Sequence, residues 1–210
     1  MKKTYVLKNI KKESSKQWMK RHLNDPYVHR ARQEKYRCRS AFKLSEIIDA
    51  YPILRPGAKV LDLGCAPGGW SQVVQKKMKG KGSLVGVDLL PIQPLKDMVF
   101  IQGDIQDMET QRCIQNSAET FDVILSDIAP SLTGHAPTDR LKMEGLIHMI
   151  WKITQQMAAQ RACLIMKVFH GNMAQSIGSF FEKARYVKPA ASRSVSREIY
   201  LVAQNMKELS

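Results

Sequence analysis

A glycine-rich turn between a short apolar run and an amphipathic segment constrains the fold of this chain most. Residues 60–71 read Val-Leu-Asp-Leu-Gly-Cys-Ala-Pro-Gly-Gly-Trp-Ser, so a buried strand is predicted to end near Leu63 and a helix to begin near Trp70. In open α/β sheets, ligands bind beyond the carboxyl ends of the strands. Glycines such as Gly64 and Gly68 let the backbone approach a ligand, because no Cβ stands in the way. A tight turn without a ligand is the alternative.

Apolar runs alternate with amphipathic segments along the rest of the chain. Helices are predicted at 40–51, 70–78, 107–115, 140–157 and 172–183. Strands are predicted at 60–63, 84–87, 99–101, 121–125, 163–168, 186–188 and 199–203. This order predicts an α/β fold, with a mostly parallel, seven-stranded sheet and helices on both faces.

Positive charge is concentrated at the N-terminal end. Residues 1–45 hold 14 Lys and Arg against 3 Asp and Glu, within a total net charge of +14. We predict a basic RNA-binding arm over residues 1–35 and one folded domain over residues 36–210. Such an arm gains most by releasing counterions from a polyanion, and its aromatic residues could stack on unpaired RNA bases. A solvated tail without a partner is the alternative, and an anionic membrane surface is a weaker one.

The sequence also predicts a cytoplasmic protein. No apolar run approaches the roughly 18 residues of a membrane span, and the basic first residues are not followed by the apolar segment of a signal peptide. The four cysteines are scattered and lack zinc-type spacing, so we expect free thiols and no metal site. No feature demands a partner chain, and we expect a monomer.

Three acidic residues are predicted at the ends of neighbouring strands, namely Asp62, Asp88 and Asp104. Asp88 follows the glycine turn by about 20 positions, which suits hydrogen bonds to ribose hydroxyls, and Asp104 could meet an adenine amino group. The turn has the spacing GxxxGG rather than the GxGxxG of dinucleotide enzymes. Together these features favour S-adenosylmethionine as the cofactor, with NAD as the weaker alternative.

Two later strands carry charged residues at or near their ends. Asp127 follows the strand at 121–125, and Lys167 interrupts the apolar run at 163–168. A buried lysine is unfavourable unless it is paired or neutral, although a lysine at a strand end can also reach solvent. Glu198, which opens the last strand, is a candidate partner.

These motifs, together with Ser-Ala-Phe-Lys-Leu at residues 40–44, resemble the FtsJ/RlmE family of RNA ribose 2′-O-methyltransferases over about residues 18–203. The resemblance implies a Rossmann-like, S-adenosylmethionine-dependent methyltransferase fold for residues 36–210. It implies a catalytic tetrad of Lys43, Asp127, Lys167 and Glu198. It also implies cofactor contacts at Gly68, Trp70, Asp88, Asp104 and Asp127, to which we add Gly64 of the glycine turn. Cys65, where alanine is common, departs slightly from the pattern.

Within that family, the residues of the glycine turn are most similar to those of bacterial members that act on large-subunit (23S) ribosomal RNA. The resemblance therefore implies that the target is a uridine ribose and that the partner is the large ribosomal subunit. Tetrad chemistry requires one neutral lysine, because an ammonium group cannot accept a proton. We hypothesise that Lys167 is the base, oriented by Asp127, and that Lys43 stays charged and steadies the oxygen. Glu198 would hold Lys43 or the ribose.

The loop at residues 192–197 would add phosphate contacts, or is an ordinary solvated turn.

Three other functions compete with RNA ribose methylation. A base-directed methyltransferase is disfavoured, because the chain has neither an Asp/Asn-Pro-Pro-aromatic motif nor a nucleophilic cysteine after the fourth strand. A non-catalytic RNA-binding protein would not need a lysine in the fifth strand. An NAD dehydrogenase would require NAD to saturate the site.

Overall fold

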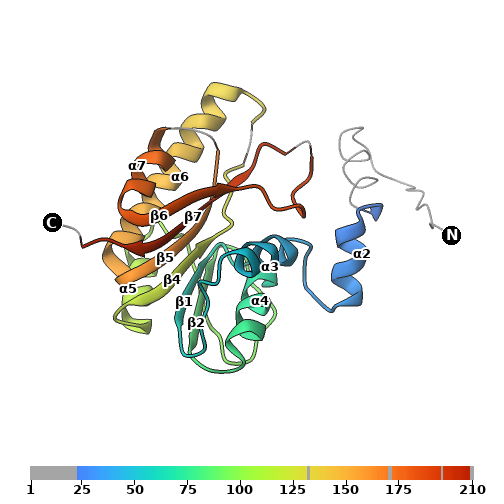
Figure 1. Ribbon diagram of the computed structural model, residues 1–210, viewed down its shortest axis with the longest axis horizontal. Helices are drawn as coiled ribbons and strands as arrows, with labels where there is room; N and C mark the ends of the chain where they lie inside the picture. Colours follow the sequence, from blue (N-terminus) through green and yellow to red (C-terminus); the bar gives the residue numbers. More distant parts are fainter. Residues whose placement is uncertain (1–22, 132, 170–171, 195, 209–210) are drawn as a thin grey trace.

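The computed structural model describes residues 23–131, 133–169, 172–194 and 196–208. Within them lies a seven-stranded sheet with the order β3-β2-β1-β4-β5-β7-β6 (Figure 1). The strands are β1 (Lys59–Leu63), β2 (Ser83–Asp88), β3 (Val99–Gln102), β4 (Phe121–Ser126), β5 (Ala158–Val168), β6 (Phe181–Val187) and β7 (Ile199–Met206). Strands β1 to β5 pair in parallel, whereas β7 is antiparallel to both of its neighbours.

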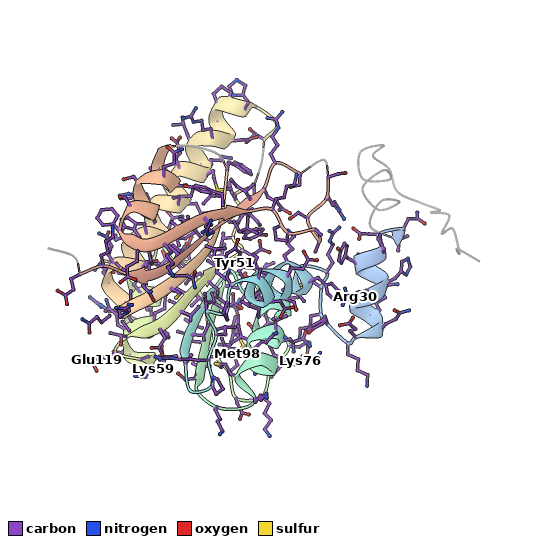
Figure 2. All side chains as sticks on the ribbon, in the orientation of Figure 1. Arg30, Tyr51, Lys59, Lys76, Met98 and Glu119 are labelled. Atoms are coloured by element: carbon purple, nitrogen blue, oxygen red, sulfur yellow. The ribbon has the colours of Figure 1, made fainter. Side chains whose placement is uncertain are left out.

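Helices cover both faces of this sheet, and side chains fill the space between the layers (Figure 2). The helices are α2 (Pro26–Gln33), α3 (Ala41–Ala50), α4 (Gly69–Met78), α5 (Met108–Ser117), α6 (Ala136–Met157) and α7 (Asn172–Ser179). On β1, Val60 packs in the same apolar cluster as α3 and α4, while Leu61 and Leu63 pack with α5, α6 and α7. The alternation of side chains along the strand thus feeds two cores. The predicted mostly parallel sheet with helices on both faces is confirmed.

The prediction was wrong at the boundary between α7 and β6. A helix was expected over residues 172–183 and a short strand at 186–188, but α7 ends at Ser179 and β6 begins at Phe181. Residues 182–185 contain good helix formers, yet β6 pairs with β7 from Phe181 to Val187. Tertiary pairing overrides the local helix propensity here. Charged side chains on this edge strand also discourage pairing with other chains.

Helix α2, which lies within the predicted arm, packs against the folded domain. Its N-cap is Asp25, whose side chain accepts a hydrogen bond from the Tyr27 backbone N–H at 3.0 Å. The Tyr27 ring lies 5.6 Å from the Phe42 ring at the start of α3, and the Arg30 guanidinium lies over the same ring. Residues 1–22, the rest of the predicted arm, lie outside the described residues. None of the helices in the described part of the chain is long and apolar enough to cross a membrane.

Strand β1 places a carboxyl group in the core. Asp62 is 1% exposed, and its Oδ2 accepts a hydrogen bond of 2.6 Å from the Ser71 hydroxyl. Its Oδ1 has no hydrogen-bond partner among the described residues. Desolvation by burial raises the pKa of Asp62 to about 7, although the Ser71 hydrogen bond opposes the change. Asp62 therefore makes the stability of the fold depend on pH.

The sign of this dependence is set by the higher pKa of Asp62 in the folded state. The unfolded chain has the ordinary aspartate pKa of about 3.9, so the folded state binds more protons between about pH 4 and pH 7. The free energy of unfolding should fall as the pH rises through that range. Asp62→Asn, which removes the charge, should flatten the fall and stabilise the fold above about pH 7. Urea unfolding of both proteins at several pH values measures this, and equal slopes would contradict it.

Candidate active site

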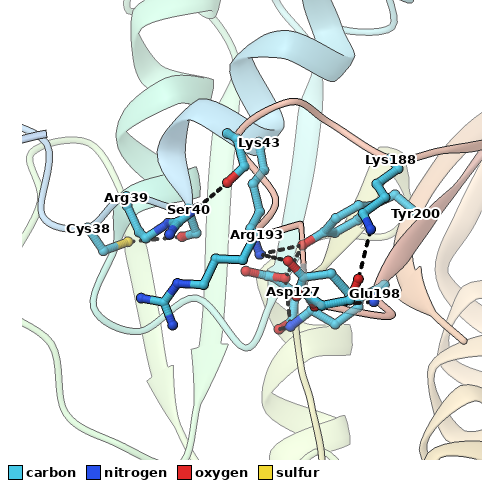
Figure 3. A network of polar contacts seen from close by, with 12 residues as sticks. Cys38, Arg39, Ser40, Lys43, Asp127, Lys188, Arg193, Glu198 and Tyr200 are labelled. Carbon is cyan, nitrogen blue, oxygen red and sulfur yellow. Dashed lines mark hydrogen bonds and ion pairs between the residues drawn. The ribbon is translucent and has the colours of Figure 1, made fainter. Parts of the chain in front are cut away.

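Four residues from distant parts of the chain meet at the carboxyl edge of the sheet, and Figure 3 labels three of them, Lys43, Asp127 and Glu198. The Lys43 Nζ of α3 lies 2.6 Å from Glu198 Oε1, just before β7. The Lys167 Nζ of β5 lies 2.8 Å from Asp127 Oδ1, just after β4. Lys167 Nζ also donates a hydrogen bond to the Asp127 backbone carbonyl at 2.7 Å. The structure thus brings together the residues of the predicted tetrad as two ion pairs.

The sheet topology explains why these residues converge. Strands β4 and β5 are parallel, with Ser126 opposite Met166, so Asp127 and Lys167 leave the same edge side by side. Strand β7 is antiparallel to β5 and starts at this edge, where Lys167 pairs with Tyr200. Glu198 therefore precedes β7 at the point where β5 ends.

Tyr200 joins the two ion pairs, and the sequence analysis missed it. Its hydroxyl donates a hydrogen bond to Asp127 Oδ1 at 2.7 Å and accepts one from Lys43 Nζ at 3.2 Å. The side chain is fully buried, and its ring packs against Trp70 with centroids 5.7 Å apart. Burial, followed by the negative charges of Asp127 and Glu198, raises the pKa of Tyr200. The hydroxyl therefore stays neutral.

A sequence signal for Tyr200 did exist. In a strand, residues two apart lie on the same face, so a hydroxyl two positions after Glu198 points to the same side of β7.

The two ion pairs are largely withdrawn from water. The exposed fractions are 10% for Lys43, 16% for Glu198, 10% for Lys167 and 17% for Asp127. Buried charges require such pairing, and breaking one pair leaves its partner uncompensated.

A cavity of about 460 Å³ lies at the same edge of the sheet. Its wall contains Gly64, Asp88 and Asp104, and also Ile128, which directly follows Asp127. The opposite wall comes from α6, between Leu141 and Met149. Ligand sites typically have volumes of about 300–1,000 Å³ and mostly apolar walls with a few polar groups. The cavity is thus large enough for a nucleoside-sized ligand, and it borders the cluster of the two ion pairs.

The polar groups of this cavity are held by backbone hydrogen bonds. The two carboxylate oxygens of Asp88 accept hydrogen bonds from the N–H groups of Ala66 and Leu90, at 2.8 and 2.9 Å. Asp104 Oδ1 accepts one from Gln106 at 2.9 Å. Gly64 has a φ of +75°, and a Cβ there would collide with the Ile128 side chain. The turn therefore needs glycine for its conformation and for its close approach to the segment after β4.

Three of the predicted cofactor residues lie away from the described cavity wall. Asp127 belongs to the ion-pair cluster. Trp70 is 2% exposed, and its indole N–H donates a hydrogen bond of 2.9 Å to the Ser40 carbonyl. Gly68 has a φ of +107° and lies against Arg37, which donates hydrogen bonds to the Pro67 carbonyl and to a later loop. The Trp70 side chain therefore anchors α4 beside α3.

Among the described residues there is no group of three or more His, Cys, Asp or Glu side chains that could hold a metal ion. The expectation that the protein works without a metal stays a prediction. The four cysteines are free thiols.

Comparison with known proteins gives one consistent result. Residues 36–206 match the model of the FtsJ-like methyltransferase family. The ribosomal RNA large subunit methyltransferase E of Hyphomonas neptunium is 40% identical over 96% of this chain and 88% of its own length. The protein of the same name from Legionella pneumophila is 38% identical over 91% of this chain and 96% of its own length.

Solved structures support the same assignment. The crystal structure of a ribosomal RNA methyltransferase from Plasmodium falciparum is similar, with a TM-score of 0.73 and 28% identity over 81% of this chain and 98% of that chain. The pre-rRNA processing protein fibrillarin of Methanococcus jannaschii has a TM-score of 0.51 at 13% identity over 74% of this chain and 70% of its own, and shares the fold. The Rossmann-like methyltransferase fold is confirmed, and the chain belongs to the FtsJ-like methyltransferase family.

Proposed function

We propose that this protein transfers a methyl group from S-adenosylmethionine to the ribose 2′-hydroxyl of a uridine in large-subunit (23S) ribosomal RNA. The large ribosomal subunit is the proposed partner and substrate. The contact chain Lys167–Asp127–Tyr200–Lys43–Glu198, next to a nucleoside-sized cavity, is the observation that carries this proposal. The names of the bacterial relatives support the choice of RNA. We still predict that the protein is a monomer, that it is cytoplasmic and that it makes no contact with a membrane.

S-adenosylmethionine fits the residues that line the cavity. Asp88 would hold the ribose hydroxyls and Asp104 the adenine amino group, while Gly64 lets the ligand approach the backbone closely. Gly68 and Trp70 would act by holding the turn and the start of α4 in place. When bound, the cofactor supplies an electrophilic methyl group on a sulfonium.

The protein's own groups would manage the proton and the charge. In its neutral form, the Lys167 amine accepts the proton of the 2′-hydroxyl, and Asp127, 2.8 Å away, stabilises the ammonium that results. Lys43 remains charged through its contact with Glu198 and stabilises the oxygen as negative charge develops. Tyr200 keeps the two lysines in a fixed relation. Each group thus has a separate task.

The role of Lys167 as the base is tested by two substitutions. Lys167→Ala should lower kcat by about 10²–10⁴-fold, the contribution typical of a general base, while the affinity for S-adenosylmethionine changes little. Lys167→Arg keeps a positive charge near Asp127 but cannot deprotonate, so it should be equally inactive. Lys77→Ala, which removes an exposed lysine on α4, is the control. Methyl transfer to RNA is measured, and substantial activity in Lys167→Arg would refute the assignment.

Gly145 tests the location of the cofactor. It lies on α6 in the cavity wall, and a Cβ there would have no described heavy atom within 4 Å. Gly145→Ala should bind S-adenosylmethionine normally and stabilise the helix by about 1 kcal/mol. Gly145→Phe should fill part of the cavity and weaken binding by about tenfold or more, the effect of about 1.4 kcal/mol. Calorimetric titration measures both, and equal affinities would place the cofactor elsewhere.

The bridging hydroxyl of Tyr200 also has a measurable effect. Tyr200→Phe removes both of its hydrogen bonds to charged groups and keeps the ring packed on Trp70. Such hydrogen bonds are worth about 1.5–3 kcal/mol each, so we expect kcat to fall by at least about tenfold with little change in cofactor affinity. Single-turnover kinetics is the suitable measurement. If the variant reacts as fast as the wild type, the bridge does not contribute to catalysis.

A further inference from the structure

The loop that carries Glu198 is held against α3 at several points. The described residues of this β6–β7 loop, 188–194 and 196–198, extend toward α2, as Figure 1 shows. At Ala191, Glu46 Oε2 accepts a hydrogen bond from the backbone N–H at 3.1 Å, and Arg39 donates one to the carbonyl. At its far end, Lys43 binds Glu198. Helix α3 and the residue Arg39 before it thus hold the loop at Ala191 and at Glu198.

Asp25 binds two of the arginines around this loop. It ion-pairs with Arg39, which precedes α3, and its Oδ2 lies 3.3 Å from Arg193 Nε in the β6–β7 loop. Figure 3 shows Arg39 and Arg193 in the same network as Lys43 and Glu198. The Asp25 side chain is 7% exposed, and that of Arg39 is 14% exposed. Two guanidinium groups therefore converge on one buried carboxylate.

This carboxylate has an electrostatic task that a neutral group cannot perform. Without its negative charge, Arg39, whose side chain is 14% exposed, and Arg193, whose side chain is 32% exposed, would be like charges at close range. Their repulsion would loosen the contact with the Ala191 carbonyl and move the β6–β7 loop away from α3. That the 192–197 loop contacts phosphates, or is a solvated turn, stays a prediction; within it, Arg193 Nε contacts Asp25. The contact of Arg193 with Asp25 thus helps to fix the position of the loop.

We infer that Asp25 is a positioning residue for catalysis: by holding Arg39 and Arg193, it keeps the β6–β7 loop and the Glu198 carboxylate against Lys43. This inference rests on the proposed function. Asp25 acts through other side chains and contacts none of the proposed reacting groups. It also caps α2, which lies within the predicted RNA-binding arm. The same carboxylate therefore connects that arm with the catalytic cluster.

Asp25→Asn removes the negative charge of this side chain but keeps an oxygen that can cap α2. Asparagine caps helices about as well as aspartate, so α2 should persist while the ion pairs are lost. We expect kcat for methylation of large ribosomal subunits to fall by about 3- to 30-fold, the range for mutations that act through a contact network. The affinity for S-adenosylmethionine should stay unchanged. Asp49→Asn is the matched control, because it removes an exposed carboxylate that pairs with Lys77 and lies outside the predicted arm. It should leave kcat unchanged.

A double-mutant cycle shows whether Asp25 acts through Glu198. In a Glu198→Gln background, Asp25→Asn should cause no further loss, because the group that it positions is already gone. Losses that multiply would assign Asp25 a merely structural role and overturn the inference. If Asp25→Asn does not fold, Arg193→Gln removes the Asp25–Arg193 ion pair from the loop side. The double-mutant cycle with Glu198→Gln is then made with that variant. A wild-type protein that methylates no RNA would overturn the proposed function, whereas an active wild type matched by Asp25→Asn overturns this inference.

Discussion

Two ion pairs joined by one phenol hydroxyl form the constraint on which the active-site arrangement depends. Lys167 with Asp127 and Lys43 with Glu198 are mostly withdrawn from water, so each charge needs its partner. Tyr200 contacts one member of each pair and is itself fully buried. Because the hydroxyl is neutral, it can donate to the carboxylate and accept from the ammonium at the same time. The sheet edge therefore holds these polar groups in a fixed arrangement.

The position of this cluster follows from the order of the strands. The parallel pair β4 and β5 delivers a carboxylate and an amine at the same edge, and the antiparallel β7 returns there with a glutamate and a tyrosine. Gly64 of the turn after β1 and residues of α6 both line the neighbouring cavity. Helix α3 supplies Lys43 to this edge, and its Glu46 accepts a hydrogen bond from the loop before β7. The ion-pair cluster and the cavity are thus adjacent but built from different segments.

Much of this arrangement was predictable from the sequence, because apolar strands and strand-end acidic residues are local signals. Hydrophobic runs located the strands, and the glycine turn located one wall of the cavity. The tetrad itself came from resemblance, because no local pattern joins Lys43 on α3 to Glu198 before β7. The bridging Tyr200, 157 residues from Lys43, was missed for the same reason. Asp25 and Arg193 are 168 residues apart, so their contact was equally hidden. The end of α7 was misplaced because pairing with β7, a tertiary effect, decides it.

The chemical position of the transferred methyl group tests the central claim most directly. Large ribosomal subunits from cells that lack this protein would be incubated with it and with methyl-labelled S-adenosylmethionine, and the RNA then hydrolysed in alkali. Alkaline cleavage needs a free 2′-hydroxyl, so a methylated ribose protects the adjoining phosphodiester. The account predicts label in an alkali-stable dinucleotide that yields 2′-O-methyluridine on enzymatic digestion. Label in a base-methylated mononucleotide, or no label in RNA, would contradict it.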